Sequence, residues 1–328
     1  MNAKIVEFTA IGEPRDVLVI AEQIVEVTPA QPILIRMLYA PVNPADGLRI
    51  RGKFGFTESL PATLGGEAVG TIEGFHESFQ FEEHGFRVGD LCILPMGSTW
   101  AQFKAVVADE LVVMPSDIDP KQLSMFGINA ASSLLLLQSA NLKAGDWFIQ
   151  NAANSAMGKL IITFARRQGL KSINIVRRED VFAELTGLGA DVVLLDGADL
   201  KERVARATQG AHVKVALDAV AGSASGRLVE TLAFGGRLIL YGLLSDNTLT
   251  LPANRIAFHG ISVSGFSRMA CMRHIGKEVT AKLFQDLAQW HMEGLFRFDI
   301  DSVFPIDNVI AAFEASELPK AGKVLLQF

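Results

Sequence analysis

A turn of small residues, NAANSAMGK, lies between the apolar segment DWFIQ and the apolar-periodic segment LIITFARRQG. Within it, Ala152, Ser155 and Gly158 form the pattern A-x-x-S-x-x-G. Backbone N–H groups can approach a pyrophosphate only where side chains are small, and the N-terminus of a following helix adds positive potential. The pattern has one glycine where the dinucleotide fingerprint has three, so an ordinary strand-to-helix turn remains an alternative. Our hypothesis is a phosphate-binding turn.

Two adjacent arginines, Arg177 and Arg178, stand nineteen residues after Gly158, where the next apolar segment ends. A fold that binds NAD places an acidic side chain here, against the ribose 2′-hydroxyl. Guanidinium groups instead suit a 2′-phosphate, which they bind through charge-assisted and often bidentate hydrogen bonds. The alternative is a solvated turn in which the arginines of RRED pair with its own acids. The pair favours NADPH as the cofactor.

The predicted secondary structure that positions these residues changes along the chain. From Lys4 to about Val113, short apolar segments with β-branched residues alternate with Gly, Pro and Asp, which is typical of a mostly β domain. From about Asp119, apolar strands alternate with helical stretches, the pattern of βαβ units around a parallel sheet. The expected fold is therefore α/β. Its six strands suit a doubly wound dinucleotide fold and cover 147–150, 172–176, 192–195, 214–218, 236–241 and 261–265.

The stretch after Arg268 predicts an amphipathic helix, because Val279, Leu283, Leu287 and Trp290 recur at helical spacing, and then a strand in VLLQF. This tail could join either domain. We find no Ser/Gly linker, so we expect the domains to share an interface whose cleft is the default place for a ligand.

The composition bounds the class of protein. The chain has 328 residues, of which 49% are hydrophobic, enough for about two globular domains. Thirty Lys and Arg against thirty-six Asp and Glu give a net charge of -6, so we expect no nucleic-acid partner. Cys92 and Cys271 are too few for a disulfide framework or a Cys-rich zinc lobe. The N-terminal segment does not read as a leader and no apolar run reaches the length of a membrane span, so we expect a cytoplasmic protein without a membrane partner.

The order of the motifs along the whole chain resembles a known superfamily. APVNPADGLRIRG and LPATLGGEAVG come first, then RVGD, QNAANSAMG, INIVRRED, LYGLL and finally AGKVLL. This order is similar to that of the medium-chain dehydrogenase/reductase superfamily, and QNAANSAMG with INIVRR resembles its zinc-free branch of mitochondrial-type 2-enoyl thioester reductases and zeta-crystallin-type quinone oxidoreductases. The resemblance implies a GroES-like catalytic domain at 1–118, a Rossmann NADPH-binding domain at 119–267 and a return to the catalytic domain at 268–328.

The resemblance also implies cofactor contacts by position. The pyrophosphate would lie on Asn154, Ser155, Ala156 and Met157, and the 2′-phosphate among Arg177, Arg178 and Glu179. The further contacts would be Asn129, Tyr241, Gly242, Leu243, Leu244, Phe266, Ser267, Arg268 and Lys323. Tyr241 and Phe266 could equally be core residues, and Lys323 a solvated one.

Three positions that hold zinc ligands in the alcohol dehydrogenases of this superfamily correspond to Asn43, Gly66 and Ile128. None of these side chains is an effective zinc ligand, so we expect no metal. His76 and His84 lie in HESFQFEEHG, which we interpret as a solvated hairpin rather than a metal site.

The resemblance fails at one catalytic position. Enoyl thioester reductases carry a tyrosine shortly after the NP-x-D segment, and Phe54 stands at that place here. A phenyl ring cannot donate a proton. Asn43 remains as the residue that could bind the oxyanion or orient the substrate, although it could equally cap the NPAD turn.

We therefore expect an NADPH-dependent, zinc-independent reductase of quinones, enones and 2-enoyl thioesters. The hydride would go to the electron-poor carbon of the acceptor. Phe54 favours quinones or enones among these small-molecule substrates. The alternatives are a 2-enoyl-CoA/ACP reductase of fatty acid synthesis and a crystallin-like NADPH-binding structural or RNA-binding protein. The resemblance also implies a homodimer, paired through the edge strand at 261–265.

Overall fold

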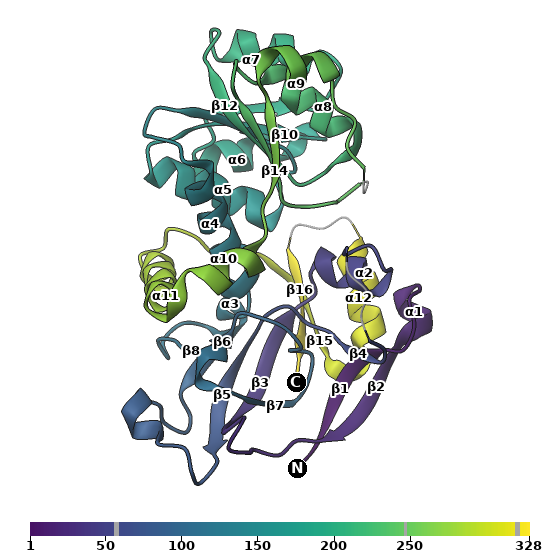
Figure 1. Cartoon of the computed structure of the whole chain (residues 1–328), viewed down its shortest axis with the longest axis vertical. Helices are drawn as coiled ribbons and strands as arrows, with labels where there is room; N and C mark the ends of the chain where they lie inside the picture. Colours follow the sequence, from purple (N-terminus) through teal and green to yellow (C-terminus); the bar gives the residue numbers. More distant parts are fainter. Residues whose placement is uncertain (56–58, 246–247, 319–321) are drawn as a thin grey trace. The chain divides into compact units, whose positions relative to one another are not determined.

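The computed structural model describes residues 1–55, 59–245, 248–318 and 322–328, and its contacts divide the chain into two units (Figure 1). Unit 1 comprises Met1–Ala131 and Met272–Phe328, and unit 2 comprises Ser132–Cys271. The tail from Met272 onward thus belongs to unit 1.

The first boundary lies between Ala131 and Ser132, whereas we expected it between residues 118 and 119. The difference has a physical cause in the contacts of the intervening segment. The amide of Gln122 makes two hydrogen bonds with the backbone of Phe298, at 3.0 and 2.8 Å, and the N–H of Ile128 donates to the carboxylate of Glu67. These contacts tie residues 119–131 to unit 1.

Unit 2 contains a sheet of six parallel strands, which confirms the α/β fold. Its order is β11-β10-β9-β12-β13-β14, the order of a doubly wound dinucleotide-binding fold. The strands are β9 (Trp147–Gln150), β10 (Lys171–Val176), β11 (Val192–Leu195), β12 (Val213–Asp218), β13 (Arg237–Leu240) and β14 (Ser262–Gly265). Each lies within one residue of an expected strand at its start and at its end.

The helices between these strands pack along the sheet in Figure 1. They are α5 (Ala156–Arg167), α6 (Phe182–Leu188), α7 (Leu200–Ala207), α8 (Gly222–Thr231) and α9 (Ala253–His259). The helix α4 (Ala131–Ala140) precedes β9, and α10 (Arg268–His274) follows β14. The core beneath them includes Ile149, Ile173, Ala216 and Leu238, one from each of four neighbouring strands. β-Branched and aliphatic runs form β9, β10, β12 and β13 because the sheet is buried there.

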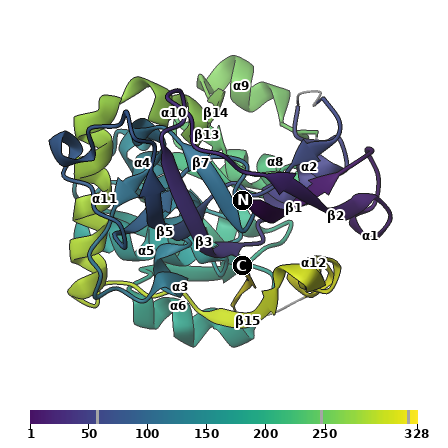
Figure 2. The same cartoon turned by 90° about the horizontal axis from the view of Figure 1, so that it is seen from below.

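Unit 1 is built around a seven-stranded sheet to which both ends of the unit's sequence contribute (Figure 2). The path runs β15-β16-β3-β5-β6-β8, with β7 beside β3, and a second sheet has the order β2-β1-β4. The strands are β1 (Asn2–Phe8), β2 (Leu18–Ile24), β3 (Ile33–Pro41), β4 (Ala62–Thr63), β5 (Ala68–Phe75), β6 (Leu91–Leu94), β7 (Phe103–Val106), β8 (Val112–Val113), β15 (Ile300–Pro305) and β16 (Lys323–Gln327).

Five helices accompany these sheets in unit 1. They are α1 (Pro14–Val17), α2 (Pro44–Ile50), α3 (Pro120–Leu123), α11 (Gly276–Met292) and α12 (Val309–Glu317). The expected amphipathic helix is α11, which buries Leu283 and Leu287 but leaves Val279 exposed. A five-residue π-helix, Phe126–Ala130, also lies in unit 1. Within the described residues, every helix is too short or too polar to span a bilayer.

The segment at residues 76–85 lies in the connection between the antiparallel strands β5 and β6 and has no buried residue, as expected for a solvated hairpin. It contains a 3-10 helix, Phe81–His84, and a row of stacked rings. Phe79 stacks on His84 at 5.0 Å between ring centroids, and His84 stacks on Phe86 at 5.5 Å. Aromatic stacking thus orders an exposed connection.

Candidate active site

The carboxyl ends of the six parallel strands bring the predicted cofactor residues of unit 2 to one edge of the sheet. Parallel strands end at the same edge, which is where ligands bind in doubly wound folds. The predicted residues follow β9 (154–157), β10 (177–179), β13 (241–244) and β14 (266–268). The structure therefore gathers the predicted residues of unit 2, while Asn129 and Lys323 lie in unit 1 with Asn43 and Phe54.

The turn between β9 and α5 has the geometry of an anion site. Ser155 is the N-cap of α5, and its hydroxyl accepts a 3.1 Å hydrogen bond from the N–H of Gly158. A Cβ at Gly158 would lie 2.5 Å from the carbonyl oxygen of Ala153, so only glycine fits there. The N–H groups of Ala156 and Met157 are the first two of the helix and have no partner within it. Their amides and the helix dipole suit a pyrophosphate.

Arg177 and Arg178 are exposed directly after β10, on the strand next to β9. Arg178 forms an ion pair with Asp180 at 3.2 Å, in which both side chains are more than half exposed. An exposed pair of this kind contributes little and can be exchanged for another anion. Among the described residues, none forms an ion pair with Arg177. Both guanidinium groups are thus available to a phosphate.

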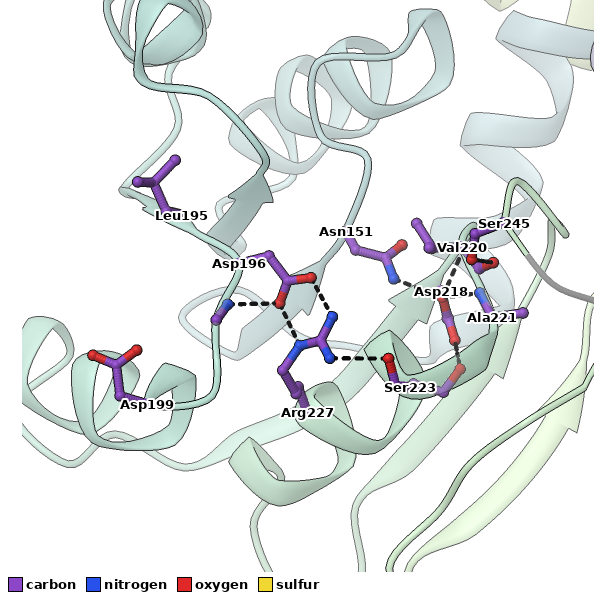
Figure 3. A network of polar contacts seen from close by, with 12 residues as sticks. Asn151, Leu195, Asp196, Asp199, Asp218, Val220, Ala221, Ser223, Arg227 and Ser245 are labelled. Carbon is purple, nitrogen blue, oxygen red and sulfur yellow. Dashed lines mark hydrogen bonds and ion pairs between the residues drawn. The ribbon is translucent and has the colours of Figure 1, made fainter.

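Sequence reasoning missed a buried polar network that joins the ends of β9 and β12 (Figure 3). The carboxylate of Asp218 accepts hydrogen bonds from the Asn151 amide at 2.6 Å and the Val220 N–H at 2.9 Å, and the Ser225 hydroxyl also donates to it. The amide oxygen of Asn151 accepts from the N–H of Ala219 at 2.8 Å. These bonds fix the backbone where the strand order reverses. The sequence signal was present, since Asn151 follows the apolar strand β9 directly and Asp218 is the last residue of β12.

The same network holds Ala221 in an unusual backbone conformation, with φ of 66° and ψ of -162°. This region of conformational space is essentially restricted to glycine. The N–H of Ala221 donates to Asp218 at 3.1 Å. Strain of this size persists only where surrounding bonds over-determine the backbone, which is the case at this edge of the sheet.

The side chain of Tyr241 shows whether the carboxyl edge of this sheet fits a cofactor. Its N–H donates to the carbonyl of Asp218 at 2.8 Å, which places it beside the Asp218 network. Its hydroxyl is buried and has no hydrogen-bond partner within the described residues. Burial, and then the nearby charge of Asp218, raise the pKa of Tyr241, so the hydroxyl keeps its proton. An unpaired buried hydroxyl at the ligand-binding edge fits a bound molecule that supplies the missing partner.

In unit 1, a second buried network surrounds Glu67, a residue that sequence reasoning did not select. Glu67 is 1% exposed. Its Oε1 accepts from the side-chain amides of Asn43 at 3.1 Å and Asn129 at 3.2 Å, and its Oε2 accepts from the N–H of Ile128 at 2.5 Å. The Nζ of Lys323 donates to the amide oxygen of Asn43 at 2.5 Å. Glu67 thus joins predicted residues from three distant segments.

Asn43 also occupies the N-cap of α2, as the alternative interpretation of NPAD predicted. Its N–H donates to the carboxylate of Asp46 at 2.9 Å, whereas its side chain bonds to Glu67 and Lys323. Burial raises the pKa of Asp46 to about 6, and this shift is opposed by the Asn43 hydrogen bond and by the positive charges of Arg49 and Lys323. The cap therefore fixes the backbone and leaves the Asn43 amide in the Glu67 network.

Comparison with known proteins decides the family. Residues 29–116 match the alcohol dehydrogenase GroES-like domain, and residues 156–286 match the zinc-binding dehydrogenase domain. The mitochondrial enoyl-[acyl-carrier-protein] reductase of Dictyostelium discoideum is 31% identical over 275 residues, which cover 81% of this chain and 77% of that protein. The chain belongs to the medium-chain dehydrogenase/reductase superfamily.

Two further proteins are similar to this chain over most of its length, one in sequence and one in fold. The mitochondrial enoyl-[acyl-carrier-protein] reductase of Xenopus tropicalis is 28% identical over 322 residues, covering 94% of this chain and 90% of that protein. A crystal structure named as a candidate NADPH:quinone reductase of Bacillus thuringiensis is 25% identical, with a TM-score of 0.92 over 100% of this chain and 99% of that one. Within the superfamily, this chain is an oxidoreductase.

The positions that carry zinc ligands in some members of the superfamily have other contacts here. The Cβ of any larger residue at Gly66 would lie 2.7 Å from the Cδ1 atom of Ile128, so the isoleucine side chain fills the space. The amide of Asn43 is engaged by Glu67 and Lys323. Across the described ranges, no three His, Cys, Asp or Glu side chains are arranged to hold a metal ion.

Phe54, at the position of the tyrosine in the thioester-reducing members, follows α2 in unit 1 and is 36% exposed. The backbone leading to it is fixed by hydrogen bonds from the N–H of Gly52 to Arg49 at 3.0 Å and from the N–H of Lys53 to Leu48 at 2.7 Å. The ring is apolar and has no proton to give. Its catalytic role stays a prediction.

Proposed function

We propose that this protein is an NADPH-dependent, zinc-independent reductase of quinones and enones. The observation that carries the proposal is the carboxyl edge of the unit 2 sheet, where the Ser155-capped turn and the exposed Arg177 and Arg178 follow the adjacent strands β9 and β10. A dinucleotide phosphorylated at the 2′ position presents two anions, a pyrophosphate and a phosphate, to such an edge. NADPH, the cofactor of this enzyme, is a dinucleotide of this kind.

Different residues of unit 2 would bind different groups of NADPH. The amides of Ala156 and Met157 would bind the pyrophosphate, and Arg177 and Arg178 would bind the 2′-phosphate. The unpaired hydroxyl of Tyr241 would find a hydrogen-bond partner. When bound, NADPH supplies a hydride to an electron-poor carbon of the acceptor.

Unit 1 supplies the group that we assign to the oxygen of the acceptor. Hydride addition to a conjugated carbonyl or a quinone leaves negative charge on an oxygen, which hydrogen-bond donors stabilise. The group is the side-chain amide of Asn43, which is held by Glu67 and by Lys323, the residue that the resemblance assigns to the cofactor. This arrangement orients the Asn43 amide without a metal.

Phe54 sets the preference among acceptors. A 2-enoyl thioester needs a proton at carbon after hydride transfer, and a tyrosine serves this purpose in the thioester reductases that the chain resembles. A reduced quinone takes its protons on oxygen, directly from water. Since Phe54 has no proton to donate, quinones are favoured over 2-enoyl thioesters.

A second candidate is reduction of 2-enoyl thioesters. The observation that favours it is the 31% identity to the Dictyostelium discoideum enoyl-[acyl-carrier-protein] reductase. A panel of substrates separates the two functions. NADPH oxidation is measured with quinones, small enones and a crotonyl thioester, each with and without a metal chelator. We expect turnover to be highest on quinones or enones and unchanged by the chelator. A thioester turned over faster than every quinone and enone would contradict the preference.

The cofactor preference gives a prediction about Arg177 and Arg178. Each charge-assisted contact to the 2′-phosphate contributes about 1.5–3 kcal/mol, so we expect NADPH to bind roughly tenfold to hundredfold more tightly than NADH. Arg177→Gln combined with Arg178→Gln should remove this preference and leave NADH binding within about threefold. Titration by NADPH and NADH fluorescence measures both dissociation constants. Equal constants for the wild-type protein would refute the role of the pair.

The exposed edge of the unit 2 sheet gives a prediction about assembly. β14 ends the strand order, its four residues are all exposed, and it carries no charge to block edge pairing. We expect a homodimer through this edge, with twice the mass of the 35.5 kDa chain in sedimentation. Val263→Lys, on the edge, should give monomers, whereas Val88→Lys, on an exposed site of unit 1, should not. A wild-type monomer at micromolar concentration would exclude the dimer.

A further inference from the structure

Arg227 and Asp196 form an ion pair at the carboxyl edge of the unit 2 sheet (Figure 3). Arg227 lies on α8, and Asp196 directly follows β11. The Nε of Arg227 donates to Oδ1 of Asp196 at 2.7 Å, and its Nη2 donates to Oδ2 at 2.5 Å. The Nη1 also donates to the hydroxyl of Ser223 at 3.1 Å. The guanidinium group thus uses three of its five N–H donors on Asp196 and Ser223.

Asp196 stands next to the arginines that we assign to the 2′-phosphate. Val176 of β10 and Leu195 of β11 are paired in register, so Arg177 and Asp196 are the next residues on neighbouring strands. The N–H of Asp196 donates to the carbonyl of Val176 at 2.8 Å. Neighbouring strands lie about 4.8 Å apart, so the Asp196 backbone borders the site of the 2′-phosphate.

A bare carboxylate at this point would oppose the binding of NADPH. A phosphate monoester carries a charge of about -1.5 to -2 at neutral pH, and like charges repel. Glu179 and Asp180 already accompany Arg177 and Arg178 after β10, and Asp196 adds a further carboxylate after β11. Loss of the Arg227 charge would leave this carboxylate without its ion-pair partner.

We propose that Arg227 determines the cofactor preference by neutralising Asp196, an inference that rests on the proposed NADPH dependence. Arg227 acts through Asp196, because its two hydrogen bonds to that carboxylate hold its positive charge there. Asp196 would keep its place without Arg227, since its Oδ1 also accepts from the N–H of Gly197 at 2.9 Å. Removing the arginine thus leaves the negative charge where it repels the 2′-phosphate of NADPH but not NADH.

The test is a double-mutant cycle on cofactor binding, read by fluorescence titration of NADPH and NADH. We expect Arg227→Met to raise the dissociation constant for NADPH by about tenfold and to change that for NADH by less than about threefold. Asp196→Asn alone should leave NADPH binding within about threefold of the wild type. The double variant, Arg227→Met with Asp196→Asn, has the wild-type net charge and should return to within about threefold of it.

A control and a stability measurement separate this role from a structural one. Lys214 pairs with Asp146 at 2.6 Å, at the amino ends of β12 and β9 and therefore at the end of the sheet opposite to the proposed cofactor site. Lys214→Met removes one positive charge, as Arg227→Met does, and should not change the preference for NADPH over NADH. Melting temperatures are measured for every variant. Equal losses of NADPH and NADH affinity in Arg227→Met, or a double variant that is not restored, would overturn the proposal. A wild-type protein that binds both cofactors equally would overturn the proposed NADPH dependence as well.

Discussion

Replacing Glu67 by alanine is expected to lower the free energy of unfolding by at least about 3 kcal/mol and to reduce turnover by about a hundredfold. The carboxylate accepts hydrogen bonds from Asn43, Asn129 and Ile128 in a site that is 1% exposed. Each buried donor left without an acceptor costs about 1–3 kcal/mol. The loss of turnover follows because the Asn43 and Asn129 amides lose their orientation, and small misplacements of this kind cost about a hundredfold in rate.

Glutamine at position 67 is expected to have a smaller effect, for a reason visible in the contacts. Both asparagine amides donate to Oε1 of Glu67, and a glutamine oxygen can accept both. The glutamine nitrogen would then replace Oε2 and meet the N–H of Ile128, so two donors would face each other. We expect Glu67→Gln to cost about 1–3 kcal/mol, through this one lost acceptor.

The control for Glu67 is Glu73, on strand β5 of the same segment. Glu73 pairs with Arg36 at 2.5 Å on a surface where both side chains are solvent-accessible, and the arginine lowers its pKa. Glu73→Gln should change stability by less than about 1 kcal/mol, as expected for a surface ion pair. Urea denaturation measures all three variants. A Glu67→Ala protein as stable and as active as Glu73→Gln would show that the buried network does not hold the site.

The parallel sheet was predictable from the sequence because its signal is local. The inner strands of unit 2 are short apolar runs bounded by turn residues, and a buried parallel strand needs nothing more. The two arginines after β10 were found for the same reason, since their place follows from counting residues after Gly158. Parallel topology then places the carboxyl ends of all six strands at one edge of the sheet. Strands predicted correctly therefore also locate the ligand-binding edge.

The unit boundary was not predictable by the same reasoning. Residues 119–131 read as the first helical stretch of the α/β pattern, and local periodicity does not tell which core a helix joins. The side chains of Gln122 and Phe126 decide it: the first bonds to Phe298, and the ring of the second packs on His291 at 5.6 Å between centroids. Both partners lie more than 150 residues away in the sequence.

The Glu67 network was hidden for a related reason. Lys323 and Asn43, which are in direct contact, are separated by 280 residues, and no spacing rule links them. A weaker signal did exist in LGGEAVG, where a lone acid stands among glycines and apolar residues. Acidic side chains are almost never fully buried unless they are paired, so such a position predicts either a strand end or a buried polar network. The expected cytoplasmic location stays a prediction.

Restoring the hydroxyl at position 54 is expected to raise turnover on a crotonyl thioester by at least about tenfold. Phe54→Tyr places a phenol where the thioester reductases that the chain resembles carry one, and a positioned general acid or oxyanion donor contributes about 10²–10⁴-fold. Reduction of quinones should stay within a few-fold of the wild type, because the reduced quinone takes its protons from water. The measurement is NADPH oxidation on both substrates at saturating cofactor.

The control for this gain is a tyrosine far from the predicted site. Phe258 is 79% exposed on α9 of unit 2, so Phe258→Tyr adds the same hydroxyl without placing it in unit 1. It should change neither activity. Because Phe54 itself is 36% exposed, an added hydroxyl can be solvated and should cost little stability. A Phe54→Tyr protein that binds NADPH normally and gains nothing on the thioester would show that Phe54 serves packing alone, or that the substrate pocket does not accept an acyl thioester.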